Sequence, residues 1–124
     1  MKVLIAEDDP ILQRVLQANL IEWGYEVIDA SDGNEAWEII QQPKSPSLVL
    51  SDWMMPGMDG LTLCRNIRRM DRPDYIYFIV LTAKNDVIEA LEAGADGYMA
   101  KTLDMDPLIR RIGDLLGVDQ NRVD

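Results

Sequence analysis

The sequence predicts a single α/β domain in which helices cover both faces of a parallel β-sheet. The chain has 124 residues, of which 48% are hydrophobic, and this suits one domain with one core. Short apolar runs alternate with helical patterns along the whole sequence, and the run at residues 48–50 is continuous, as in a strand buried on both faces. Five such strand–helix units require right-handed crossovers, which place helices on the faces of a parallel sheet.

Each predicted strand is a short apolar run that turn-forming residues interrupt. The expected strands span residues 3–6, 25–30, 48–50, 76–81 and 97–100. Proline cannot continue regular backbone hydrogen bonding, so residues 43–46 and the segment around Pro73 are expected to be loops.

Five helices are expected between and after these strands. Asp9, Asp59 and Asp104 are expected to be N-caps, because a carboxylate accepts hydrogen bonds from the free N–H groups of a first turn. The second helix opens at residues 32–33, the short fourth helix spans residues 86–93, and the last helix has Pro107 in its first turn. Gly24 is expected to end the first helix, whose apolar face carries Leu12, Leu16, Leu20 and Trp23.

The composition excludes several classes of function. The 22 acidic and 12 basic residues give a net charge of −10, and surfaces that bind nucleic acids or anionic membranes need basic residues, so neither partner is expected. The absence of His excludes a Ser-His-Asp triad, His-ligated zinc and phosphohistidine on this chain. The single Cys64, expected to be buried, cannot form an internal disulfide, and no signal peptide is visible. A cytoplasmic location is therefore expected.

Polar residues follow four of the five predicted strands at the point where each strand ends. The carboxyl ends of parallel strands lie along one edge of an open sheet, which is where such folds bind ligands. We therefore expect these side chains to form one site. They are Glu7, Asp8 and Asp9 after the first strand, Asp52 after the third, Thr82 after the fourth and Lys101 after the fifth.

The residue types at this edge indicate phosphoryl chemistry supported by a metal ion. Clustered carboxylates repel each other unless a cation lies among them, and oxygen ligands suit Mg²⁺, for which Mn²⁺ could substitute. An aspartate such as Asp52 can act as a nucleophile toward phosphorus. Phosphoryl transfer needs positioning and charge neutralisation, for which the Lys101 ammonium and the Thr82 hydroxyl are suited.

The chain resembles the receiver domain of two-component response regulators, of the chemotaxis-receiver-like superfamily. The matching segments are VLIAEDDP at residues 3–10, DWMMPGMDG at 52–60, LTAK at 81–84 and AGADGYMAK at 93–101. The resemblance implies a (βα)5 flavodoxin-like, doubly wound sheet with strand order 2-1-3-4-5. Residues 1–118 would form the receiver domain. Residues 119–124 would form a polar tail, which is interpreted as the stub of a linker.

The resemblance also implies a role for each acid of the predicted site. Asp52 would be the phosphoacceptor, phosphorylated by a partner phosphohistidine on a histidine kinase or a phosphotransfer protein. Asp8, Asp52 and the backbone carbonyl of Met54 would bind Mg²⁺, and Glu7 would help through a water molecule. Asp9 is interpreted as the helix cap.

Thr82, Lys101 and the Ala83 amide would contact the phosphoryl group. Tyr98 resembles the switch aromatic of the family, which swings inward when Thr82 moves toward the phosphate. This movement would change the face formed by the fourth and fifth strands and helices, which in the family dimerises or contacts an output domain or protein. A homodimer is thus among the expected assemblies. No enzymatic activity is expected beyond phosphoryl acceptance and slow self-dephosphorylation.

Two features depart from the family pattern. Thr102 follows Lys101 at a position where the family usually has a proline with a cis peptide bond. A non-proline cis bond costs about 3–4 kcal/mol. We therefore expect a trans bond here and a rearranged loop that displaces the Lys101 ammonium. The segment from Thr82 to Tyr98 is also shorter than usual by roughly one helical turn of about 3.6 residues, which puts signalling through this face in doubt.

Three alternative functions can be compared with the receiver. A pseudo-receiver would keep the fold as a constitutive protein-interaction module, and the two departures favour it. A phosphatase of the haloacid dehalogenase type would need a second aspartate at position 54, which is Met54. A flavodoxin-like flavin carrier would need a hydroxyl- or glycine-rich loop after the first strand, where three acids stand instead.

Overall fold

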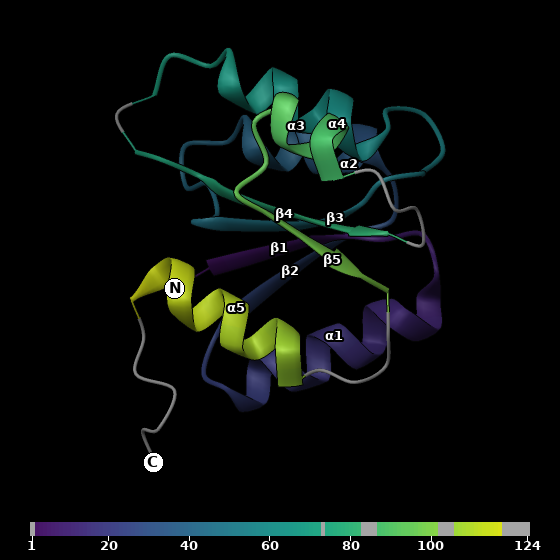
Figure 1. Ribbon diagram of the computed structural model, residues 1–124, viewed down its shortest axis with the longest axis vertical. Helices are drawn as coiled ribbons and strands as arrows, with labels where there is room; N and C mark the ends of the chain where they lie inside the picture. Colours follow the sequence, from purple (N-terminus) through teal and green to yellow (C-terminus); the bar gives the residue numbers. More distant parts are fainter. Residues whose placement is uncertain (1, 73, 83–86, 102–105, 118–124) are drawn as a thin grey trace.

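The computed structural model describes residues 2–72, 74–82, 87–101 and 106–117 (Figure 1). One parallel sheet has the order β2-β1-β3-β4-β5. The predicted fold class and strand order are therefore confirmed. The strands are β1 (Lys2–Ala6), β2 (Glu26–Ala30), β3 (Leu48–Asp52), β4 (Tyr77–Thr82) and β5 (Gly97–Ala100).

The helices form a layer on each side of the sheet. Helices α1 and α5 cover one face, and α2, α3 and α4 cover the other (Figure 1). The central strand β3 is buried along its whole length, which explains its continuous apolar sequence. The helices are α1 (Pro10–Glu22), α2 (Gly33–Ile40), α3 (Gly60–Arg68), α4 (Val87–Glu92) and α5 (Asp106–Leu116).

Aspartates begin three of these helices. Asp9 accepts a hydrogen bond of 2.9 Å from the N–H of Ile11, and Asp59 accepts one of 2.8 Å from Thr62. Asp32 caps α2 in the same way. The N-caps predicted at Asp9 and Asp59 are confirmed, whereas Asp104 lies outside the described residues. The caps matter for function because α1 and α3 start directly after the loops that carry the acids.

Two core clusters fill the space between the sheet and its helices. Leu4 and Phe78 belong to the cluster beneath α2, α3 and α4. Ile5 and Leu50 belong to the cluster beneath α1 and α5. Neighbouring residues of one strand thus point to opposite faces. Cys64 is fully buried in the first cluster, as predicted.

The prediction for Trp23 is wrong. Helix α1 ends at Glu22, and Trp23 is its C-cap with 42% of its surface exposed. The chain then turns at Gly24, which has a φ of +92°, so the helical period no longer applies at Trp23.

Helix α4 has six residues, in agreement with the short helix predicted at residues 86–93, although Val87 is its first residue and Glu92 its last. Residues 83–86 lie outside the described part. In the described ranges, no helix combines the length and the apolar character that crossing a membrane requires.

Candidate functional site

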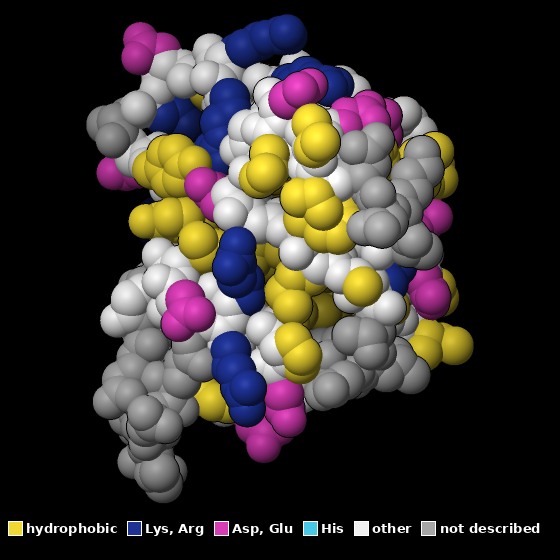
Figure 2. Space-filling view, viewed as in Figure 1, with side chains coloured by type: hydrophobic (Ala, Val, Ile, Leu, Met, Phe, Trp, Pro, Cys, Tyr) yellow, Lys and Arg dark blue, Asp and Glu magenta, His cyan; other side chains and the backbone are white. Residues whose placement is uncertain are grey.

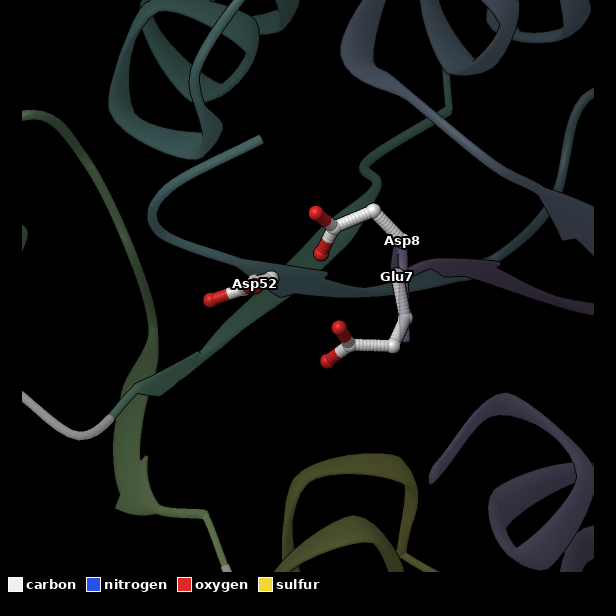
Figure 3. A group of neighbouring side chains, drawn as sticks. All are labelled: Glu7, Asp8 and Asp52. Carbon is white, nitrogen blue, oxygen red and sulfur yellow. The ribbon is translucent and has the colours of Figure 1, made fainter. Parts of the chain in front are cut away.

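Three carboxylates meet at the carboxyl edge of the sheet. Glu7 and Asp8 follow β1, and Asp52 is the last residue of β3, which pairs with β1. Figure 3 shows the carboxylates of Glu7 and Asp8 reaching toward Asp52 from the end of β1. Each residue offers an oxygen within 4.8 Å of the other two. Glu7 and Asp52 are buried, with 1% and 5% of their surfaces exposed, while Asp8 is exposed.

Lys101 completes the cluster from the residue after β5. Its ammonium nitrogen lies 2.8 Å from Asp52 Oδ2 and 3.2 Å from Glu7 Oε2. Burial works to lower the pKa of Lys101, but its bonds to Asp52 and Glu7 outweigh this effect and raise the pKa. Lys101 is therefore a permanent positive charge at this edge, and it faces the predicted phosphoacceptor directly.

Glu7 is the most strongly perturbed acid of the site. Burial raises its pKa from 4.5 to about 7, and the nearby Asp52 adds to this effect, while the amide of Asp9 and the ammonium of Lys101 oppose it. The Asp9 amide donates to Glu7 Oε2 at 3.1 Å. Glu7 Oε1 is buried and accepts no hydrogen bond from the described residues, although it lies 3.1 Å from the Lys101 nitrogen.

The backbone of Asp52 is held by two residues to which the sequence reasoning gave no role. The hydroxyl of Ser51 donates to the Asp52 carbonyl at 2.8 Å. Gly60 packs against the same carbonyl so closely that a β-carbon there would lie 2.2 Å from the oxygen. The glycine after Asp59 is the sequence feature that indicates this close contact between Gly60 and the Asp52 carbonyl, because only glycine leaves room for it.

Thr82 and Tyr98 lie on neighbouring strands next to the acids. Thr82 ends β4 with 3% of its surface exposed, and its carbonyl accepts a hydrogen bond of 3.1 Å from the Lys101 amide. Tyr98 pairs with Val80, two residues before Thr82, so the two predicted switch residues share one face of the sheet. Tyr98 is half-buried and packs against the core beneath α4.

Three further sequence predictions concern the loops around the site. Met54 lies in the loop after β3 with 56% of its surface exposed. Ala83 and the peptide bond between Lys101 and Thr102 lie outside the described residues. The displacement of the Lys101 ammonium that Thr102 led us to expect is not observed, because this ammonium contacts Asp52.

The donor set fits a hard divalent cation. All the clustered ligand atoms are carboxylate oxygens, and one buried oxygen of Glu7 still has free acceptor capacity. Three acids exceed the single charge of Lys101, so a divalent ion would balance the site. A metal bound here would neutralise charge on a phosphoryl group brought to Asp52.

A family model of the response regulator receiver domain matches residues 3–113. The chain belongs to this family. The receiver domain is 40% identical over 123 residues to the probable transcriptional regulator ycf27 of Cyanophora paradoxa, and the match covers 97% of this chain and 50% of that protein. The chain spans about half the length of the curated relatives it matches.

Solved receiver domains share its architecture. The receiver domain of the Francisella response regulator 1452 is 32% identical, with a TM-score of 0.84 and coverage of 94% of this chain and 96% of that chain. The response regulator protein TrrA of Thermotoga maritima, solved in complex with Mg²⁺-BeF, is 30% identical, with a TM-score of 0.81 and coverage of 92% and 97%. Receiver domains are regulatory modules of two-component signalling, and no observation here supports the pseudo-receiver alternative.

Proposed function

We propose that Asp52 is the phosphoacceptor of this receiver domain. It would take a phosphoryl group from a phosphohistidine on a histidine kinase or a phosphotransfer protein. The contact of 2.8 Å between Asp52 and the Lys101 ammonium carries this proposal. An attacking carboxylate oxygen needs a neighbouring positive charge, because the incoming phosphoryl group is itself anionic.

Asp8, Asp52 and the Met54 carbonyl are the proposed ligands of Mg²⁺, with Glu7 acting through a water molecule. The cluster of oxygen ligands supports this assignment. The similar protein TrrA was solved in complex with Mg²⁺-BeF. Mn²⁺ is proposed to substitute, because it accepts the same oxygen ligands. Lys101 and Thr82 would hold the phosphoryl oxygens from the side of β4 and β5.

Phosphorylation adds about −1.5 to −2 charges at neutral pH, which Lys101 and the metal would hold. Thr82 and Tyr98 are proposed to transmit this change to the face formed by β4, α4, β5 and α5. Helix α4 leaves three apolar side chains exposed, with fractions of 40% for Val87, 70% for Ile88 and 52% for Leu91. Figure 2 shows hydrophobic side chains on the surface where Figure 1 places α4. Such a surface suits an output partner or a second copy of the chain.

The domain is proposed to comprise residues 1–118, with residues 119–124 as a linker to an output domain. The twofold greater length of the curated relatives supports this proposal. Direct binding of nucleic acid by this domain is not proposed, since its net charge is −10. The expected cytoplasmic location and slow self-dephosphorylation also stay predictions.

The test is to incubate the protein with acetyl phosphate and Mg²⁺ and to measure its intact mass. The wild type should gain one phosphoryl group, and Asp52→Asn should gain none, because an amide is a poor nucleophile toward phosphorus. Asp59→Asn is a matched control, since Asp59 is a half-buried helix cap in the same loop, and the asparagine oxygen can still accept the capping hydrogen bond from Thr62. An adduct that persists in Asp52→Asn would contradict the proposal.

A further inference from the structure

A second hollow lies at the opposite, amino edge of the sheet. Its volume is about 470 Å³, and it opens between the loop before β3 and the segment that leads into β4. The Tyr77 amide donates to the Ser47 carbonyl at 3.0 Å and so joins the two walls. Pockets for small ligands usually measure roughly 300–1,000 Å³, so this hollow is large enough for one. Asp52 and Thr82 lie at the other ends of the same strands.

The charge around this hollow is opposite to that of the whole chain. Lys44 and Arg72 line it, and Asp74 is the acidic residue of its wall. Arg65 and Arg69 lie exposed at the nearby end of α3. Figure 2 shows Lys and Arg side chains at the upper left, with Asp and Glu side chains at their margin, where Figure 1 places the end of α3 and the start of β4. A local basic surface on a chain of net charge −10 favours an anion.

Arg72 is fixed in the wall with spare hydrogen-bonding capacity. Its Nη1 donates to Ser45 Oγ at 2.6 Å and to the carbonyl of Ile40 at 3.2 Å. Its Nε is buried and finds no acceptor among the residues that the structure describes. The described residues therefore do not satisfy this guanidinium completely. Ser45 and Ser47 line the same wall.

Tyr75 supplies a rigid planar surface beside these cations. Its hydroxyl donates to Asp96 Oδ1 at 2.6 Å, and the guanidinium of Arg68 lies 4.5 Å from the centre of its ring. The ring of Tyr77 meets it edge-on at 5.0 Å. Three contacts therefore hold a side chain that is still 55% exposed. An aromatic surface fixed in advance binds a planar ligand group with little further loss of entropy.

We propose that this hollow binds a small ligand that carries a phosphate group and a planar ring, of the size of a mononucleotide. The phosphate lies against Lys44 and Arg72, and the ring lies against Tyr75. The site does not depend on Asp52, because it is built from different loops at the other edge of the sheet. It is a second ligand site on the receiver domain, separate from the phosphoacceptor.

The experiment is an NMR titration of the Asp52→Asn protein with AMP in EDTA. The substitution removes the proposed phosphoacceptor, and EDTA removes metal ions that would hold AMP at the acid cluster. Saturable shifts of the amides of Lys44, Ser45 and Ser47 and of residues 74–77 are expected. Adenosine and inorganic phosphate should each bind at least fivefold more weakly than AMP. No saturable shift with AMP, or shifts centred on residues 7–9 and 52, would overturn the proposal. Phosphate binding as tightly as AMP would overturn the role of Tyr75.

Two variants test where the phosphate group of AMP binds. Lys44→Met should weaken AMP binding severalfold, and Asp74→Asn should tighten it. Both residues are exposed, so the variants should remain folded. Arg14→Met is the matched control, because it removes one positive charge from an exposed position on α1. An equal loss of affinity in Arg14→Met and Lys44→Met would mean that only net charge matters, and would overturn the site.

Discussion

The acid cluster and the surface of α4 are built in contrasting ways. Glu7 and Asp52 are almost fully buried, and Lys101 joins them from 94 residues after Glu7 and 49 residues after Asp52. Helix α4 is six residues long and leaves Ile88 with 70% and Leu91 with 52% of their surfaces exposed. The first region is therefore held by the sheet, whereas the second buries only Ala90 of the six residues of its helix.

The contrast separates the reception of a phosphoryl group from its transmission. The residues that would bind the group are set at the ends of paired strands, so they do not depend on α4. The carboxyl end of α4 is nevertheless tied down, because Arg68 donates to the Gly94 carbonyl at 2.9 Å and pairs with Asp96 at 2.9 Å. Any movement of α4 in response to phosphorylation is thus expected at its amino end.

The largest expected effect tests the acid cluster. Lys101→Met should slow phosphorylation of Asp52 by acetyl phosphate on the order of 100-fold, because the charge that faces the incoming group is lost. The rate is measured by intact mass over time. Lys2→Met is the control, since Lys2 pairs with the exposed Glu26 at 3.6 Å, away from the acid cluster. A rate equal to that of the wild type would show that Lys101 does not assist the transfer.

The next effect tests how α4 is attached. Arg68→Met should lower the free energy of unfolding by about 2 kcal/mol, because Asp96 loses its cation and two carbonyls lose a donor; this allows for the partial exposure of the pair. Urea denaturation measures the change. Arg69→Met at the exposed neighbouring position should change stability by less than about 0.5 kcal/mol. Equal effects of the two variants would contradict the role of Arg68.

A smaller effect concerns the pH dependence of the metal-free protein. Burial holds the pKa of Glu7 at about 7 against 4.5 when unfolded, so the unfolded chain loses this proton first as the pH rises. Stability should therefore fall between pH 4.5 and 7, by on the order of 1 kcal/mol from this residue. Urea midpoints in EDTA measure it, and Glu7→Gln should flatten the dependence. An unchanged slope in that variant would assign the effect to other groups.

The smallest effect is expected on the surface of α4. The double variant Ile88→Gln, Leu91→Gln should change stability by no more than about 0.5 kcal/mol per site, since both side chains are exposed. Phosphorylation by acetyl phosphate should proceed at the wild-type rate. A slower rate would mean that the two regions are coupled more tightly than their burial indicates.

The sequence was sufficient to predict the sheet and to bring the acids together. Asp52 and Lys101 each follow an apolar run, and a parallel sheet places such positions on one edge whatever the details of packing. Their alignment could be reasoned from topology alone. The caps at Asp9 and Asp59 were predictable for a similar reason, since capping is a local interaction.

Contacts that depend on packing were not predictable. Arg68 and Asp96 are 28 residues apart, and their pairing requires α3 and β5 to be placed first. Ser51 gave no signal, because a hydroxyl that bonds to the carbonyl of the next residue leaves no pattern in the sequence. The exposed Trp23 was missed because a helical period does not reveal the residue at which the helix stops.

The bridge from Glu7 to Lys101 has a consequence for the newly made chain. The ribosome produces the three acids long before the lysine that pairs with Glu7 and Asp52, and β5 joins the sheet at its outer edge. A nascent chain that ends before residue 101 carries Asp52 but not its cation. Competence to take up a phosphoryl group should therefore appear only when the domain has been completed, which keeps unfinished chains from competing for the kinase.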